Sequence, residues 1–183
     1  MEVRKIHDRE FELFIPNAQI NVAISEMAAS ISRDLEGKDV IFMGILNGAF
    51  MFAAELIKQI TPNCQITFLK LASYAGTSST GTVKRLIGIN EDIKNKTVVI
   101  LEDIVDTGIT LESIIKQLNG YEPGEIRVAT LLHKPDAYLK DIHLDYVGLE
   151  IPNDFVVGYG LDYADTHRTH PFVAELKKEV YQG

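Results

Sequence analysis

Apolar positions recur along the chain in two patterns, and together these patterns predict a mixed α/β fold. Continuously apolar runs at 40–46, 97–101 and 126–132 are typical of strands that are covered on both faces. Segments at 50–60 and 111–119 lie between these runs and carry apolar residues at helical spacing. An order of strand, helix, strand, helix, strand predicts a parallel sheet with right-handed crossovers.

The rest of the chain predicts one more helix and several shorter strands. Apolar residues recur at helical spacing from Ile20 to Leu35, with Asn17 as the candidate N-cap and Gly37 as the stop. Further strand-like runs lie at 65–73, 85–89, 145–151 and 155–160. The segment at 171–180 fits a helix or a strand equally well.

Composition and charge narrow the classes of partner. A chain of 183 residues that is 46% hydrophobic and 24% charged can bury a sizeable core, so we expect a single domain over 1–183. The formal net charge of -8 argues against nucleic acid or an acidic membrane as a partner, because both require a basic face. A small polyanionic substrate stays compatible, since local cations or a metal ion can bind it.

The expected location is the cytoplasm. Residues 1–11 are densely charged and contain no apolar stretch of the signal-peptide type. The longest uncharged stretch, 40–54, is too short to span a bilayer and is interrupted by Gly44 and Gly48. Cys64 is the only cysteine, which excludes an intrachain disulfide and suits a reducing compartment.

Residues 98–111 form the most informative segment of the sequence. An apolar strand leads to Glu102 and Asp103 at its carboxyl end, where open α/β sheets bind ligands. The turn at 106–110 follows, with Gly108 to permit tight backbone geometry and a helix start that presents free N–H groups to a phosphate. A sugar diol or a metal ion would reconcile the carboxylates with a phosphate.

Other interpretations of this segment are weaker. The acidic pair could be a solvated strand end followed by a helix cap. A P-loop fits poorly, because the pattern GxxxxGK[ST] and its lysine are absent. A phosphoacceptor signalling domain would carry its acidic pair after the first strand, whereas this pair lies beyond residue 100.

The segment resembles the phosphoribosyl pyrophosphate motif of the hypoxanthine-guanine phosphoribosyltransferases: apolar residues, Glu-Asp, two aliphatic residues and Asp-Thr-Gly-x-Thr. The resemblance continues, in the right order, through residues 45–50, 73–81, 131–135 and 151–168. It implies a type I phosphoribosyltransferase-like fold, with a central parallel sheet flanked by helices and a small hood built from the chain ends. It also implies purine salvage: transfer of the 5-phosphoribosyl group to hypoxanthine or guanine, with Mg²⁺ as cofactor and a homodimer or homotetramer as the assembly.

Site roles follow from the resemblance, residue by residue. It implies that the phosphoribosyl group and its 5′-phosphate bind at Glu102, Asp103, Ile104, Val105, Asp106, Thr107, Gly108, Ile109, Thr110 and Leu111, with Asp106 as the catalytic proton acceptor. It implies that pyrophosphate binds at Asn47, Gly48 and Arg168, often beside a non-proline cis peptide. It implies that the purine binds at Lys134, Phe155, Val156 and Asp162, and Mg²⁺ at Glu102, Asp103 and Asp162.

Two positions depart from the pattern of the family. Many relatives carry a basic residue where this chain has Asn47, so a role of the backbone there is better supported than a role of the side chain. Some relatives carry a cation at the position of Ile109. Phosphate binding in this chain must therefore rest on backbone amides and threonine hydroxyls.

Residues 73–84 are small and polar, and they include Ser73 and Tyr74. As a bare pattern they could be a hairpin loop with no further task. Their length favours a lid that closes over the reacting centre and excludes water, because long idle loops are uncommon in compact domains.

Several residues also have ordinary explanations. Taken alone, Lys134 is a lysine at a strand end and Phe155 is a core aromatic. The histidines and aspartates at 162–170 could suggest a transition-metal site, but they lack ligand spacing of the usual kind. A nucleotide-sensing regulatory protein with this fold is the main alternative to an enzyme.

Overall fold

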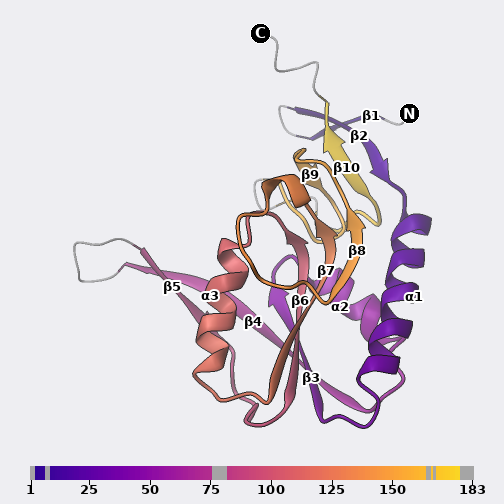
Figure 1. Ribbon diagram of the computed structural model, residues 1–183. Coiled ribbons are helices and arrows are strands. Elements are labelled where there is room, and N and C mark those ends of the chain that lie inside the picture. Colours follow the sequence, from indigo (N-terminus) through magenta and orange to yellow (C-terminus); the bar gives the residue numbers. More distant parts are fainter. Residues whose placement is uncertain (1–2, 7–8, 76–81, 164–165, 167, 178–183) are drawn as a thin grey trace.

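The computed structural model describes residues 3–6, 9–75, 82–163, 166 and 168–177. It contains two sheets and three α-helices in the described part of the chain (Figure 1). The helices are α1 (Asn17–Asp34), α2 (Phe50–Ile57) and α3 (Ile109–Asn119), and a short 3-10 helix, η1, covers Pro135–Ala137. The strands are β1 (Val3–Ile6), β2 (Arg9–Ile15), β3 (Val40–Leu46), β4 (Cys64–Ala75), β5 (Thr82–Ile87), β6 (Thr97–Val105), β7 (Glu125–His133), β8 (Tyr146–Glu150), β9 (Val156–Val157) and β10 (Val173–Leu176).

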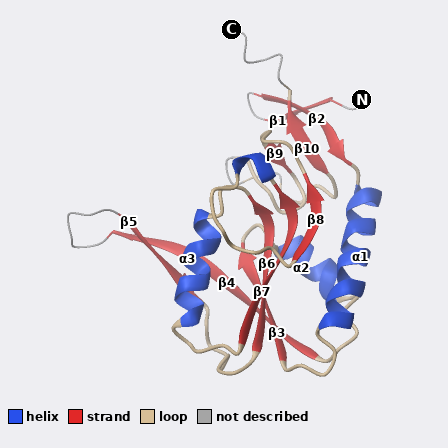
Figure 2. Ribbon diagram, in the orientation of Figure 1, coloured by secondary structure: helices blue, strands red, loops and turns tan. Residues whose placement is uncertain are grey.

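The larger sheet has the order β5-β4-β3-β6-β7-β8. All neighbours from β4 to β8 are parallel, and β5 is antiparallel to β4 at the edge. The predicted parallel sheet with helical crossovers is confirmed. Parallel strands leave their carboxyl ends at one edge, and in Figure 2 this edge faces the smaller sheet.

Two clusters of buried side chains cover the two faces of the larger sheet. One joins α1 and α2 to residues such as Phe42 and Leu101, and the other joins α3 to residues such as Ile41 and Ile100. Adjacent residues of one strand enter different clusters because side chains alternate across a sheet. The continuous apolar runs of β3 and β6 therefore reflect burial on both faces.

The smaller sheet is the predicted hood built from the chain ends, and its strand order is β1-β2-β10-β9. It brings residues from both ends of the chain together, as Figure 1 shows above the larger sheet. Phe11 of β2 and Val157 of β9 share a small third cluster with Leu176 of β10. The segment at 171–180, undecided from sequence, contributes a strand here.

Several predicted boundaries were wrong. The first helix has Pro16 at its N-cap position; Asn17 is the first helical residue and donates its side-chain amide to the Pro171 carbonyl oxygen at 2.8 Å. The run at 155–160 is a strand only over Val156–Val157. Positive φ values at Gly158, Tyr159 and Gly160 turn the backbone out of the ladder there.

The predicted polar connection between the fourth and fifth strands is shorter than expected. Ser73 pairs with Lys84 and Tyr74 with Val83 in an antiparallel ladder, so both residues belong to strands. Backbone hydrogen bonds can pair two strands whatever side chains they carry. A prediction from apolar positions therefore misses these strand ends. Residues 76–81 of the predicted lid lie outside the described residues.

None of the helices in the described part of the chain is long and apolar enough to cross a membrane.

Candidate functional site

A cavity of about 270 Å³ lies where β6 ends and α3 begins. Its lining contains nine of the ten residues predicted to bind the phosphoribosyl group. They are Glu102, Asp103, Ile104, Val105, Asp106, Thr107, Gly108, Thr110 and Leu111. The tenth, Ile109, is 56% exposed and is absent from the lining.

The loop of this cavity depends on Gly108. Gly108 has φ 78° and precedes the first residue of α3, where no side chain caps the helix. In the first turn of α3 the Ile109 N–H donates to Thr107 Oγ1 at 3.5 Å, which leaves the N–H groups of Thr110 and Leu111 to bind an anion. The helix begins two residues earlier than predicted, so Ile109 and Thr110 belong to this turn.

The acidic pair lies inside β6, which runs on to Val105 instead of ending at 101 as predicted. Pairing with β7 continues past the carboxylates, and Glu102 lies opposite Thr130. Glu102 is buried at 6% exposure. Burial first, and the Asp103 charge second, hold the pKa of the Glu102 carboxyl well above its ordinary value.

Asp103 lies where three segments of the chain meet: its own strand β6, the turn at Gly48, and the segment that carries Asp162 and Arg168. Burial raises its pKa to about 6, while N–H groups of the backbone and the Arg168 guanidinium act in the opposite direction. Its carboxylate lies against Gly48, where an added Cβ would come within 1.8 Å of Asp103 Oδ2. Asp162, whose charge raises the pKa of Asp103 further, pairs with Arg168 at 2.8 Å between Oδ1 and Nη2.

The turn after β3 approaches Asp103 with its backbone. The Leu46–Asn47 peptide is cis, as the resemblance implied for this position. The Asn47 side chain is exposed. A Cβ added to Gly160 would lie 1.9 Å from the Gly48 carbonyl oxygen, so two glycines pack together beside Asp103. The role of Gly160 was missed from sequence, although its place in the Gly-Tyr-Gly triplet at 158–160 was a signal.

Lys134 is 7% exposed, and its Nζ lies 3.1 Å from Asp106 Oδ2. Its backbone N–H donates to the Val105 carbonyl oxygen at 3.0 Å, which ties the end of β7 to the end of β6. A buried ammonium requires a partner, because desolvation otherwise disfavours its charge. Lys134 is therefore not the solvated strand-end lysine that the bare pattern allowed.

Phe155 is 47% exposed, so it is not the core residue that its residue type alone would suggest. Its ring centroid lies 6.3 Å from that of Phe11 and 5.9 Å from that of Tyr163. Val156 follows it and is buried in β9. An exposed ring held by two others can offer its free face to a planar ligand.

The carboxylates fit a hard cation of the magnesium class. No group of three or more histidine, cysteine, aspartate or glutamate side chains converges as a metal site within the described ranges. Two adjacent carboxylates with raised pKa values still suit Mg²⁺, which takes few protein ligands and completes its shell with water and substrate oxygens. Asp165 and His167, considered for a transition metal, lie outside the described residues.

Comparisons with known proteins agree with this geometry. Residues 16–164 match the model of the phosphoribosyl transferase domain. The chain is 40% identical over 179 residues to a hypoxanthine-guanine phosphoribosyltransferase of Staphylococcus aureus, covering 97% of this chain and 100% of that protein.

Solved structures agree as well. A crystal structure of hypoxanthine phosphoribosyltransferase from Staphylococcus aureus matches with a TM-score of 0.82 and 40% identity, covering 94% of each chain. The Trypanosoma cruzi enzyme in complex with its product IMP matches with a TM-score of 0.83 and 31% identity, covering 97% of this chain and all of that one. The chain therefore belongs to the hypoxanthine-guanine phosphoribosyltransferase family of purine-salvage transferases.

Proposed function

We propose that the cavity at 102–111 binds the phosphoribosyl group of phosphoribosyl pyrophosphate, and that the chain transfers this group to hypoxanthine or guanine with release of pyrophosphate. The observation that carries the proposal is the shared lining: the carboxylates of Glu102, Asp103 and Asp106 and the start of α3 border one cavity, with Lys134 beside it. Carboxylates suit the ribose hydroxyls, and the helix start suits the 5′-phosphate.

The leaving pyrophosphate would bind on the side of Asp103 that the turn after β3 approaches. Backbone groups of Asn47 and Gly48 border that side, together with the Arg168 guanidinium. A guanidinium can bind a phosphate through two N–H groups at once. Glu102 and Asp103 would hold Mg²⁺ there, which supplies positive charge against the pyrophosphate, and Asp162 would act from further out.

The purine belongs between Phe155 and the lid that begins at Ser73 and Tyr74. Lys134 has three N–H donors, and one of them donates to Asp106 Oδ2. It can therefore donate to a 6-oxo group while it stays paired. An adenine amino group would place a donor against a donor, and such a mismatch discriminates strongly. Val156 and Asp162 would read the remaining base edge through backbone groups.

Asp106 accepts the ring proton that the purine loses. Positive charge builds on the ribose as its bond to pyrophosphate breaks, and the carboxylates near the sugar stabilise that charge. Lys134 at 3.1 Å holds the Asp106 carboxylate in place until the base arrives. Closure of the lid would exclude water, which otherwise competes for the ribosyl cation.

The proposal is tested by incubating the enzyme with phosphoribosyl pyrophosphate and a panel of hypoxanthine, guanine, xanthine and adenine, with and without Mg²⁺. We expect nucleotide and pyrophosphate from hypoxanthine or guanine, only with Mg²⁺, and none from adenine. If no base gives a nucleotide while the protein still binds IMP, the nucleotide-sensing alternative replaces the enzyme.

The proposal includes a cytoplasmic homodimer or homotetramer. Ile66 and Phe68 lie two residues apart on β4, so they share a face, and they are 41% and 38% exposed. A second copy would cover such side chains. Light scattering coupled to gel filtration measures the mass, and a monomer at micromolar concentration would contradict this part of the proposal.

A further inference from the structure

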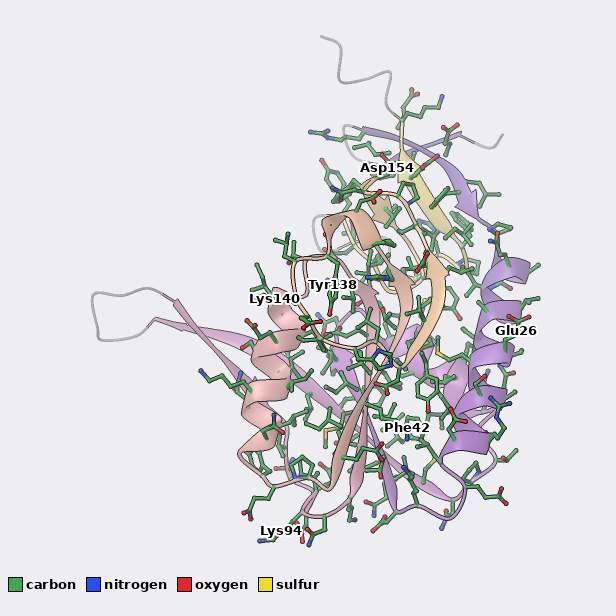
Figure 3. The ribbon with its side chains drawn as sticks, in the orientation of Figure 1. Glu26, Phe42, Lys94, Tyr138, Lys140 and Asp154 are labelled. Carbon is green, nitrogen blue, oxygen red and sulfur yellow. The ribbon has the colours of Figure 1, made fainter. Side chains whose placement is uncertain are left out.

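The segment 138–140 crosses the loop that begins α3 and contacts it at three consecutive residues. The Leu139 N–H donates to the Thr107 carbonyl oxygen at 3.1 Å. Lys140 Nζ lies 2.8 Å from Glu112 Oε2 in the first turn of the helix. The Tyr138 ring lies so close to Gly108 that an added Cβ would be 2.5 Å from Tyr138 Cε2. Figure 3 shows Tyr138 and Lys140 together above the start of α3.

Three further contacts hold Tyr138 in place. Its hydroxyl donates to the Ile142 carbonyl oxygen at 2.8 Å. The His133 ring meets it edge to face, with centroids 5.2 Å apart and planes at 84°. Tyr138 also packs against the apolar cluster beneath α3. A ring fixed in this way is a rigid support, because it has few rotamers left to exchange.

These contacts matter because they surround Gly108: a Cβ added there would meet the Tyr138 ring first and Lys140 Cγ, at 3.0 Å, next. Gly108 has a positive φ, and glycine loses more conformational freedom on folding than any other residue. The direction of the free N–H groups in the first turn of α3 depends on this one backbone conformation. A support that removes alternative conformations before the ligand binds lowers the entropy cost of binding.

We infer that Tyr138 is a positioning residue for the 5′-phosphate: its ring holds Gly108 in the conformation that directs the N–H groups of α3 into the cavity. The inference rests on the proposed function, since it assumes that the phosphate binds there. It assigns no contact between Tyr138 and the substrate. When the ring is removed, we expect weaker binding of ligands that carry the 5′-phosphate and unchanged binding of ligands that lack it.

The test compares IMP with inosine, which differ only in the 5′-phosphate. Dissociation constants are measured by calorimetry for the wild type, Tyr138→Ala, Tyr138→Phe and a control, Tyr121→Ala. Tyr121 lies beyond the far end of α3 and is 48% exposed. We expect Tyr138→Ala to weaken IMP at least about tenfold and inosine less than about twofold. Tyr138→Phe keeps the ring and should stay within about threefold for IMP.

Steady-state kinetics give an independent readout. Tyr138→Ala should raise the KM for phosphoribosyl pyrophosphate and leave the KM for hypoxanthine nearly unchanged. Circular dichroism shows whether the variant is folded, and Tyr138→Leu, which keeps apolar bulk but no ring, replaces it if it is not. Equal weakening of IMP and inosine by a folded variant, or no weakening of either, would overturn the inference.

The two hypotheses fail in different ways. If wild-type protein binds IMP no more tightly than inosine, the proposed phosphate site itself is wrong. If the wild type prefers IMP strongly and Tyr138→Ala preserves that preference, only the positioning role of Tyr138 is wrong.

Discussion

Asp106 and Lys134 form an ion pair at the proposed reaction centre. Their sequence positions are 28 residues apart, and the ends of β6 and β7 bring them within 3.1 Å. The sequence suggested a role for each residue but not this contact, because it depends on parallel pairing of the two strands. The contact places a cation beside the proposed proton acceptor and fixes the direction of its carboxylate.

Replacing Asp106 by Asn tests this role. The amide keeps the shape of the carboxylate but cannot accept the purine proton, so we expect turnover to fall at least about a hundredfold. The dissociation constant for IMP should change less than about threefold. Rates of nucleotide formation and calorimetric binding measure the two effects, with Asp136→Asn, an exposed carboxylate outside the cavity lining, as the control. Unchanged turnover would remove Asp106 from the mechanism.

Asp103 should make stability depend on pH. Its folded-state pKa of about 6 lies above the value of about 3.9 for an unfolded aspartate, so the folded protein holds the proton more tightly. Ionisation therefore destabilises the fold by an amount that is absent below about pH 4, grows towards pH 6 and is complete above it. An uncharged residue in the place of Asp103 would not destabilise the fold in this way.

We accordingly expect Asp103→Asn to raise the free energy of unfolding at pH 8 by about 1 to 3 kcal/mol, and by much less at pH 4. Urea unfolding at the two pH values, in the absence of Mg²⁺, measures the difference. The exposed residue Asp39 supplies the control Asp39→Asn. The same variant should lose activity, since the carboxylate is proposed to face the substrate. A gain that is equal at both pH values would show that the Asp103 charge is not its source.

At the scale of elements, sequence periodicity located most strands and helices but not their ends. The helical pattern at 111–119 begins two residues inside α3, and the apolar pattern at 97–101 ends four residues before β6 does. Both missed ends carry site residues. Function places polar and charged side chains at the carboxyl ends of strands, so an apolar pattern stops before the element does.

The backbone of the turn at 158–160 packs so closely against Gly48 that only glycine fits at position 160. Gly160 has φ 102° and an added Cβ would meet the Gly48 carbonyl, whereas Gly37 has φ 76° and no atom within 4 Å of an added Cβ. Gly160→Ala should therefore displace the backbone near Asp103 and lower the free energy of unfolding by several kcal/mol. Gly37→Ala should lower it by only about 1 kcal/mol, because an alanine there is strained only by its left-handed backbone. Thermal unfolding measures stability, and the KM for phosphoribosyl pyrophosphate should rise only for Gly160→Ala. Equal effects of the two variants on both quantities would contradict the packing argument.

At the scale of the molecule, the hood has a small cluster of buried side chains of its own, besides the clusters of the larger sheet. Phe11 belongs to the hood cluster, and its ring lies 5.9 Å from that of Tyr163 and 6.3 Å from that of Phe155. Phe42 is equally buried but packs beneath α1 and α2. The two phenylalanines therefore allow a matched comparison between the hood and the main sheet.

Phe11→Leu and Phe42→Leu should each cost about 1 to 2 kcal/mol, because both leave a small cavity. Only Phe11→Leu should raise the KM for hypoxanthine, since it loosens the support of Phe155. Calorimetric melting measures the first quantity and initial rates the second. Equal changes in the KM for hypoxanthine would show that the two cores do not act separately.

The sequence by itself determined the class of the fold, the alternation of central strands and helices along the chain and the position of the phosphoribosyl motif. These features are local: they depend on periodicity, on residue type and on short spacings within one segment. The tertiary structure alone decided that Lys134 pairs with Asp106, that Gly48, Asp103 and Gly160 pack together, and that Tyr138 covers Gly108. Such contacts join residues far apart in the chain, and they arise from the register of the strands and the shape of the packed backbone, neither of which leaves a repeating pattern in the sequence.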